Sequence, residues 1–204
     1  MQSLDQLTGL KKAGDYENGF DKMLEDSETD ISIVIADLDM FKRINDNYGH
    51  EAGDEIIKEM AENFKAIDAK KDVYRYGGEE YLIIFPGMPK EEAFLIMESA
   101  RKSAVKGEIC AKYSMTASMG IATYPDDGAN WIELKRKAEG ALYRAKVAGR
   151  NKICLAKEEK LVTKTAHYTI EQLKRLEKLS KERNMSEAAL MREALDELLK
   201  KYSV

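Results

Sequence analysis

The stretch "VYRYGGEEYLIIF", residues 73–85, constrains the fold of this chain more than any other feature. Two runs rich in β-branched, aromatic and aliphatic residues flank a pair of glycines and a pair of glutamates, a pattern that predicts a β-hairpin. Gly77 and Gly78 allow a tight turn and a close approach of the backbone to a ligand. Glu79 follows at the start of the returning strand, so the hairpin presents a carboxylate at its turn.

Segments with helical and strand patterns surround this hairpin. The order β-α-β-β-α-β, followed by a further helix and strand, predicts an α+β domain with helices packed on an antiparallel sheet. The expected elements outside the hairpin are a strand at 31–41, a polar loop from 41 to 54 that enters a helix at 52–67, a helix at 89–105, a strand at 113–124, a helix at 129–149 and a strand at 151–156.

Composition narrows the location and the partners. The longest apolar runs, "ISIVIA" and "YLIIF", are far shorter than the roughly 20 residues that span a bilayer, and the N-terminus has no basic segment followed by an apolar block. We therefore expect a cytoplasmic protein with no membrane partner. The formal charge of -4 argues against a polyanion-binding surface over the whole molecule, but it permits a local basic face.

Paired carboxylates point to a metal ion. Asp37 and Asp39 are two residues apart at the end of an apolar strand, so their side chains point the same way. If this strand neighbours the hairpin, Asp37 and Glu79 converge. Like charges repel, whereas hard divalent cations such as Mg²⁺ prefer oxygen ligands and commonly bridge to phosphates. The alternative interpretation is a solvated acidic turn.

Cationic and amide side chains extend the phosphate hypothesis. Lys42 can neutralise phosphate charge, and Asn45 with Asp54 offers the amide and carboxylate that a guanine edge requires. Lys146 and Arg150 lie one helical turn apart and can grip a triphosphate. A helix that ends in lysine and arginine can also be complementing its own dipole.

From about residue 4 to 157 the chain resembles the GGDEF-family diguanylate cyclases of bacteria. The segments that carry the resemblance are "DQLTGL", "DLDMFKRINDNYGHEAGD", "RYGGEEY", "SMGIATYPDDG" and "ALYRAKVAGRN", and the signature loop takes the form GGEEY. The resemblance implies a nucleotidyl-cyclase palm domain that condenses two GTP into cyclic di-GMP and two pyrophosphates, with Mg²⁺ or Mn²⁺ as cofactor. It also implies a homodimer, in which each protomer holds one GTP.

The resemblance assigns roles to individual residues. Asp37, the Leu38 carbonyl and Glu79 are expected to hold the metal. Catalysis is assigned to Glu79, which accepts the proton of the attacking 3′-hydroxyl, with Glu80 and Lys42. The residues expected to bind GTP are Phe41, Asn45, His50, Asp54, Gly77, Gly78, Lys146 and Arg150. Because the motifs begin close to Met1, no sensor domain is expected to precede them.

A different pattern follows the cyclase motifs. Residues 158–162 read as a linker, and 163–204 as a short strand at 163–169 with helices at 170–183 and 187–202. This segment resembles the ribbon-helix-helix fold of CopG-like and Arc-like repressors, in which two copies pair their strands into a ribbon that enters the major groove of DNA. The resemblance implies dimerisation and possible contacts to double-stranded DNA from Thr163, Thr165, His167 and Ser186.

Together these features predict a GGDEF diguanylate cyclase domain at 1–157 that acts as a dimer through its ribbon-helix-helix segment at 163–204. Two other functions stay open. One is a module that senses GTP without turnover. The other is a DNA-binding regulator that uses a catalytically weak cyclase domain as a sensor of GTP or cyclic di-GMP.

Overall fold

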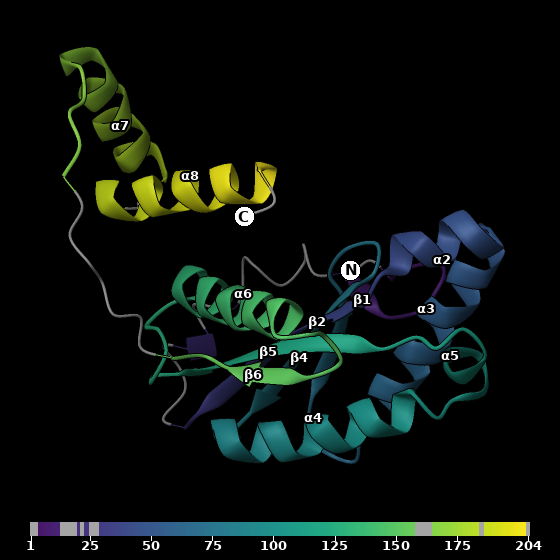
Figure 1. The fold of residues 1–204 in the computed structure, drawn as a ribbon. Coiled ribbons are helices and arrows are strands. Elements are labelled where there is room, and N and C mark those ends of the chain that lie inside the picture. Colours follow the sequence, from purple (N-terminus) through teal and green to yellow (C-terminus); the bar gives the residue numbers. More distant parts are fainter. Residues whose placement is uncertain are drawn as a thin grey trace. The chain divides into compact units, whose positions relative to one another are not determined.

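The computed structural model describes residues 4–12, 20, 23–24, 29–157, 165–183 and 186–202. The chain divides into two compact units, Met1–Glu159 and Lys160–Val204 (Figure 1). No helix within the described ranges is both long enough and apolar enough to cross a membrane.

A six-stranded sheet forms the centre of the first unit, in the order β1-β3-β4-β2-β5-β6. The strands β2, β3, β4 and β5 pair antiparallel, whereas β1 pairs with β3 and β6 with β5 in parallel. The sheet is therefore mixed, and the prediction of an antiparallel sheet was wrong at its edges. For β6 the reason is the connection, because a helix that crosses over from β5 returns the chain parallel to it. The strand bounds are β1 Lys11–Lys12, β2 Ile31–Leu38, β3 Asp72–Arg75, β4 Glu80–Pro86, β5 Ala117–Tyr124 and β6 Ile153–Leu155.

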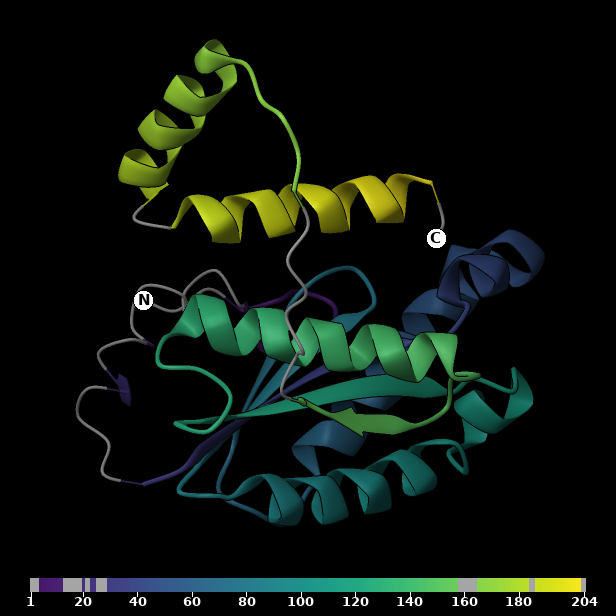
Figure 2. The same ribbon diagram turned by 60° about the vertical axis from the view of Figure 1, so that its left-hand side comes forward.

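Helices cover both faces of this sheet (Figure 2). One face carries α6, Trp131–Val147, and the other carries α3, His50–Lys65, with α4, Lys90–Ala104. The central strand β2 is buried along its whole length, and its odd-numbered residues pack in the α6 core while its even-numbered residues pack in the α3 and α4 core. Asp37 therefore falls on the α6 side of the sheet.

The segment expected to be a polar loop is largely helical. Phe41–Tyr48 forms α2, Gly49 with φ 86° separates it from α3, and α3 begins at His50. The polar loop was a wrong prediction because α2 has only eight residues, most of them polar, and its apolar residues Phe41, Ile44 and Tyr48 form a stripe too short to stand out in the sequence. The structure also adds a short helix, α5, at Glu108–Lys112.

The second unit contains two helices, α7 at Ile170–Arg183 and α8 at Glu187–Lys201. Both match the helices expected from the sequence. A capping box stands at the start of α7, because the Thr169 backbone N–H donates to Gln172 Oε1 at 2.9 Å and the Gln172 N–H donates to Thr169 Oγ1 at 3.2 Å. The strand expected at 163–169 was a wrong prediction over residues 165–169, which form no strand and have no neighbouring strand to pair with in the described part of the chain. Residues 163–164 lie outside the described residues.

Candidate active site

A pocket of about 170 Å³ lies where the chain leaves β2 and enters α2. Residues 37–42 supply most of its wall, and the turn before β4 and the end of α6 supply the rest. The pocket brings together seven residues that the sequence predicted for the site: Asp37, Leu38, Phe41, Lys42, Glu79, Lys146 and Arg150. It also includes Asp39 and Met40, which were not among the predicted site residues.

Met40 turns the chain from the strand into the helix. It occupies the N-cap position of α2 with φ 58° and ψ 27°, a left-handed conformation. A non-glycine residue in this region is uncommon and costs on the order of 1–2 kcal/mol. The sequence gives no signal for it, because methionine has no preference for that conformation.

Burial and neighbouring carboxylates disfavour the charge of Asp37 and of Glu79, two of the three carboxylates that line the pocket. The two strands place Asp37 opposite Glu80, and the Leu38 N–H donates to the Glu79 carbonyl oxygen at 3.2 Å. Burial raises the pKa of Glu79, and repulsion from Asp37 and Glu80 raises it further. Burial likewise raises the pKa of Asp37. A site that makes two neighbouring carboxylates hard to ionise is one that a cation stabilises.

The side chain of Lys146 supplies a positive charge beside Asp37. Its Nζ lies 2.7 Å from Asp37 Oδ2, and this contact opposes the rise in the pKa of Asp37. The lysine sits in the last turn of α6, and Arg150 follows in the turn beyond the helix with φ 62°. The pair therefore does more than complement the helix dipole, because both residues line the pocket beside the carboxylates.

Asp39 differs in role from Asp37 although both reach the pocket. Its carboxylate accepts hydrogen bonds from the hydroxyls of Thr116 and Ser118, both at 2.7 Å, and from the backbone N–H of Asn151 at 3.0 Å. The spacing of the two aspartates did not distinguish them. In the structure, Asp39 accepts these three hydrogen bonds, whereas Asp37 forms an ion pair with Lys146.

The glycine loop leaves open space beside the hairpin. A Cβ on Gly78 would meet no atom of the described residues within 4 Å, whereas a Cβ on Gly77 would lie 2.8 Å from Glu80 Oε2. Neither glycine is among the described residues with positive φ, so the turn does not require the backbone freedom of glycine at these two positions. Arg75 fixes the loop, since its Nη2 donates to the Gly78 carbonyl at 2.7 Å and its Nη1 lies 2.9 Å from Asp5 Oδ1.

The residues expected to read guanine lie on α2 and α3, outside the wall of this pocket. Asn45 Oδ1 is buried and has no hydrogen-bond partner in the described part of the protein. It packs so closely on α3 that a Cβ on Gly53 would lie 2.1 Å from it and 2.9 Å from Phe41 Cζ. Phe41 thus contacts both the pocket and the Asn45 region. His50 and Asp54 are exposed on α3.

The donor set fits a hard divalent cation. Among the described residues no group of three or more His, Cys, Asp or Glu side chains is placed to hold a metal ion. Asp37, Glu79 and the Leu38 carbonyl nevertheless all belong to the pocket and are all oxygen donors. Mg²⁺ typically binds through one or two carboxylates, several waters and substrate phosphates, so a site with two carboxylates suits it.

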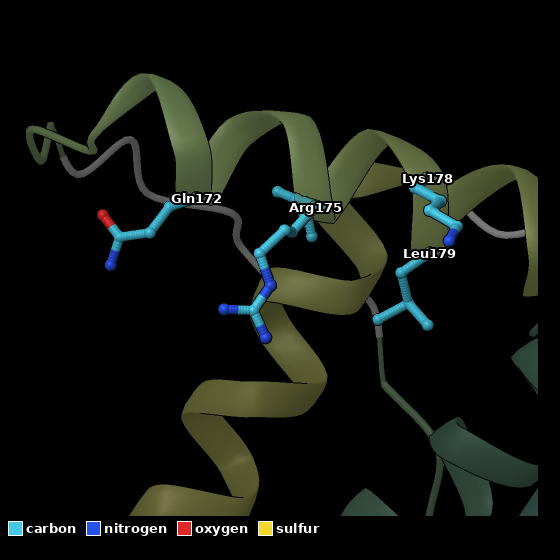
Figure 3. Close-up of a pocket in the computed structure, with 5 residues that line it drawn as sticks. Gln172, Arg175, Lys178 and Leu179 are labelled. Atoms are coloured by element: carbon cyan, nitrogen blue, oxygen red, sulfur yellow. The ribbon is translucent and has the colours of Figure 1, made fainter.

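The second unit carries a groove of about 510 Å³ along α7 (Figure 3). Its walls are Gln172, Arg175, Leu176, Lys178 and Leu179, a mixture of apolar and basic side chains without a carboxylate pair. Of the residues expected to contact DNA, Thr165, His167 and Ser186 are exposed in this unit, and Thr163 lies outside the described residues.

The layers and the pocket define a class of protein: a palm-like α+β domain with carboxylates and cations at the end of its central strand. Residues 2–152 match the family model described as "Diguanylate cyclase, GGDEF domain". The chain therefore belongs to the GGDEF family, and the expected family is confirmed.

Individual relatives agree with this assignment. The chain is 38% identical over 128 residues to the diguanylate cyclase DgcM of Escherichia coli K12, an alignment that covers 62% of this chain and 31% of DgcM. The GGDEF domain of DgcB from Caulobacter crescentus, solved with c-di-GMP, superposes with a TM-score of 0.67 at 28% identity and covers 75% of this chain and 95% of that one.

An active GGEEF domain of a diguanylate cyclase from Vibrio cholerae superposes with a TM-score of 0.61 at 28% identity, covering 68% of this chain and 88% of that one. That signature shares its first four letters with Gly77–Glu80 of this chain. The chain spans about a third of the length of the curated diguanylate cyclases it matches.

Proposed function

We propose that this protein is a diguanylate cyclase that condenses two GTP molecules into cyclic di-GMP with release of two pyrophosphates. The observation that carries the proposal is the pocket at the end of β2, where Asp37 and Glu79 meet Lys42, Lys146 and Arg150. In each half-reaction the 3′-oxygen of one GTP forms a bond to the α-phosphorus of the other. The bond from that phosphorus to the bridging oxygen breaks, and pyrophosphate leaves with its electron pair.

Asp37, the Leu38 carbonyl and Glu79 hold Mg²⁺ or Mn²⁺ in this proposal. The ion supplies charge stabilisation at the phosphates and lowers the pKa of a bound hydroxyl. Glu79 accepts the proton of the attacking 3′-hydroxyl. Glu80, which pairs with Asp37 across β2 and β4, supports the site.

The cations bind the phosphates. With a metal ion held at Asp37, Lys146 would be released from its ion pair and would contact the outer phosphates together with Arg150. Lys42 stabilises charge that develops during transfer. Phe41 lies against the triphosphate, as does the backbone of Gly77 and Gly78, where the open space beside Gly78 leaves room for it.

Guanine is read on the α2 and α3 side. The buried and unpaired Asn45 Oδ1 is an acceptor for a guanine N–H group, and Asp54 accepts from the ring and amino nitrogens. His50 completes the substrate-binding set at the start of α3. These assignments favour GTP over ATP.

The second unit makes the protein a homodimer and brings two GTP-loaded domains together. Many large apolar side chains of this unit are exposed in the single chain, including Ile170 at 75%, Leu195 at 53% and Leu198 at 51%. A segment of about 40 residues rarely forms a stable core alone. A ribbon-helix-helix dimer supplies the missing partner, and the linkage raises the effective concentration of one domain near the other.

The decisive experiment is chromatography of the products after purified protein is incubated with GTP and Mg²⁺, in parallel with ATP and with a GTP and ATP mixture. Cyclic di-GMP from GTP alone is the expected result, and a Glu79→Gln variant is the control for turnover. Binding of GTP without product at high protein concentration would instead favour a sensor.

A DNA-binding regulator is the second candidate. Exposure of Thr165, His167 and Ser186 on the second unit favours it, and this unit would contact double-stranded DNA through the paired ribbon. Electrophoretic mobility shifts with random and selected DNA, at several salt concentrations, test the idea. Binding that is sequence-selective and lost with a His167→Ala and Thr165→Ala double substitution would support it.

A further inference from the structure

The turn after α6 carries Arg150 into the pocket in a costly backbone conformation. Arg150 has φ 62° and the next residue, Asn151, has φ 48°, so two successive residues with a Cβ are left-handed. Each such residue costs roughly 1–2 kcal/mol, although asparagine tolerates the conformation better than most. A conformation of this kind persists only where the surrounding contacts enforce it. Three contacts enforce it here: the Arg150 N–H donates to the Ala145 carbonyl oxygen at 3.0 Å, and two further contacts hold Asn151.

Asp39 holds the backbone of Asn151. Its Oδ2 accepts the Asn151 N–H at 3.0 Å. The same carboxylate accepts the hydroxyls of Thr116 and Ser118 at the start of β5, both at 2.7 Å. Asp39 is only 7% exposed. Its carboxylate is therefore held in place by the residues at the start of β5, and it holds the backbone of the turn at Arg150 and Asn151.

Arg101 holds the side chain of the same asparagine. Its Nη1 donates to Asn151 Oδ1, while its Nε and Nη2 donate to the two carboxylate oxygens of Glu98, each at 2.8 Å. This bidentate pairing locks the plane of the guanidinium. Arg101 is only 9% exposed, and a buried charge of this kind is retained only when it is paired.

We propose that Asn151, clamped between Asp39 and Arg101, aims Arg150 at the outer phosphates of the bound nucleotide. Asp39 and Arg101 are then positioning residues, and the buried carboxylate of Asp39 has a purpose other than metal binding. The inference rests on the proposed GTP-binding function. It ties α4, on the face of the sheet opposite to α6, to the phosphate end of the site (Figure 2).

Two ligands separate a positioning role from a general structural one. A GTP analogue with a methylene group between its α- and β-phosphates cannot release pyrophosphate, and it presents the outer phosphates. GMP lacks them. Isothermal titration of both ligands into the full chain with Mg²⁺ measures how much of the affinity depends on the outer phosphates, without any need for turnover.

Arg101→Met removes the clamp on the Asn151 side chain. Lys102→Met is its matched control, because Lys102 also contacts Glu98, at 3.2 Å, but it is 65% exposed and makes no contact with Asn151. Asn151→Gly is a second test that spares the buried arginine and Glu98. Glycine suits the left-handed conformation and keeps the N–H that Asp39 accepts, so only the Arg101 contact is lost.

We expect Arg101→Met and Asn151→Gly to weaken binding of the analogue by about 10–100-fold, as is usual when a group that orients a ligating residue is removed. Affinity for GMP and the behaviour of Lys102→Met should be unchanged. If Arg101→Met fails to fold, Asn151→Gly decides. If the variants kept the wild-type affinity for the analogue, or lost affinity equally for the analogue and for GMP, the inference about Asn151 would be wrong, while the proposed function would stand. Failure of the wild-type protein to bind the analogue would overturn the proposed function with it.

Discussion

Gly120 on β5 lets α6 pack against the sheet at backbone contact, and Gly120→Ala tests how strictly the site depends on that contact. A Cβ at this position would lie 2.0 Å from the Ala138 carbonyl oxygen and 2.4 Å from the Leu142 nitrogen, both in the backbone of α6. No side-chain rotation relieves such a clash. The helix itself must withdraw.

The size of the displacement follows from the geometry. Ordinary contacts of a Cβ begin at 3.4 Å, so α6 must move by about 1.4 Å, the difference between 3.4 Å and 2.0 Å. Overpacking of this kind costs about 2–3 kcal/mol, which corresponds to a fall in Tm of roughly 5–10 °C for a protein of this size. Because α6 carries Lys146, a displacement near 1 Å should also lower turnover by about 100-fold.

Thermal unfolding followed by circular dichroism, with cyclic di-GMP production measured well below Tm, separates the two effects. Gly78→Ala is the matched control, since a Cβ there meets no described atom within 4 Å. It should keep the wild-type Tm yet lower activity by crowding the triphosphate. A Gly120→Ala variant with unchanged Tm and activity would refute the reasoning, because it would mean that α6 does not rest on this strand as closely as the structure indicates.

Three further predictions concern charge, specificity and assembly. Burial and then repulsion from Asp37 raise the folded-state pKa of Glu79 above its unfolded value, so ionisation of Glu79 lowers the stability of the fold as pH rises. With chelator present, Glu79→Gln should therefore raise Tm at neutral pH, and this gain should disappear below roughly pH 4.3. The same variant should lower turnover at least about 100-fold. Equal Tm values at neutral pH would contradict this. Asn45→Ala should leave Tm nearly unchanged, because Asn45 Oδ1 has no hydrogen-bond partner within the described residues. It should raise KM for GTP about 10-fold, which corresponds to a loss of roughly 1–2 kcal/mol in binding free energy. An unchanged KM would show that Asn45 does not take part in guanine recognition. Leu198→Asp, on the exposed face of α8, should shift the full chain to monomer in sedimentation and lower activity mainly at dilute protein. Leu95→Asp, on α4, should do neither, although Leu95 is 68% exposed and Leu198 51%. A dimer that survives Leu198→Asp would argue against this face as the interface.

Local patterns in the sequence were enough to predict most strands and helices. The apolar runs of β2 and β4 are continuous because both faces of these strands are buried, and α3 and α6 show helical spacing because each packs one face on the sheet. Where an element buries little, the pattern failed. The helix α2 was taken for a loop because it is short and mostly polar, with Phe41 buried and Ile44 partly buried against the core.

The motifs of the sequence also determined the family and most of the residues that meet in the pocket, since spacing along strands and helices fixes which side chains reach the same edge of a sheet. Only the tertiary structure separated Asp37, held by one lysine, from Asp39, held by two hydroxyls and a backbone N–H. Only the tertiary structure brought Arg101 into contact with Asn151, 50 residues further along the chain. Only the tertiary structure placed the backbone of α6 against Gly120. These contacts join elements distant in sequence, and their strength depends on burial and hydrogen-bond geometry that arise only once the layers have packed.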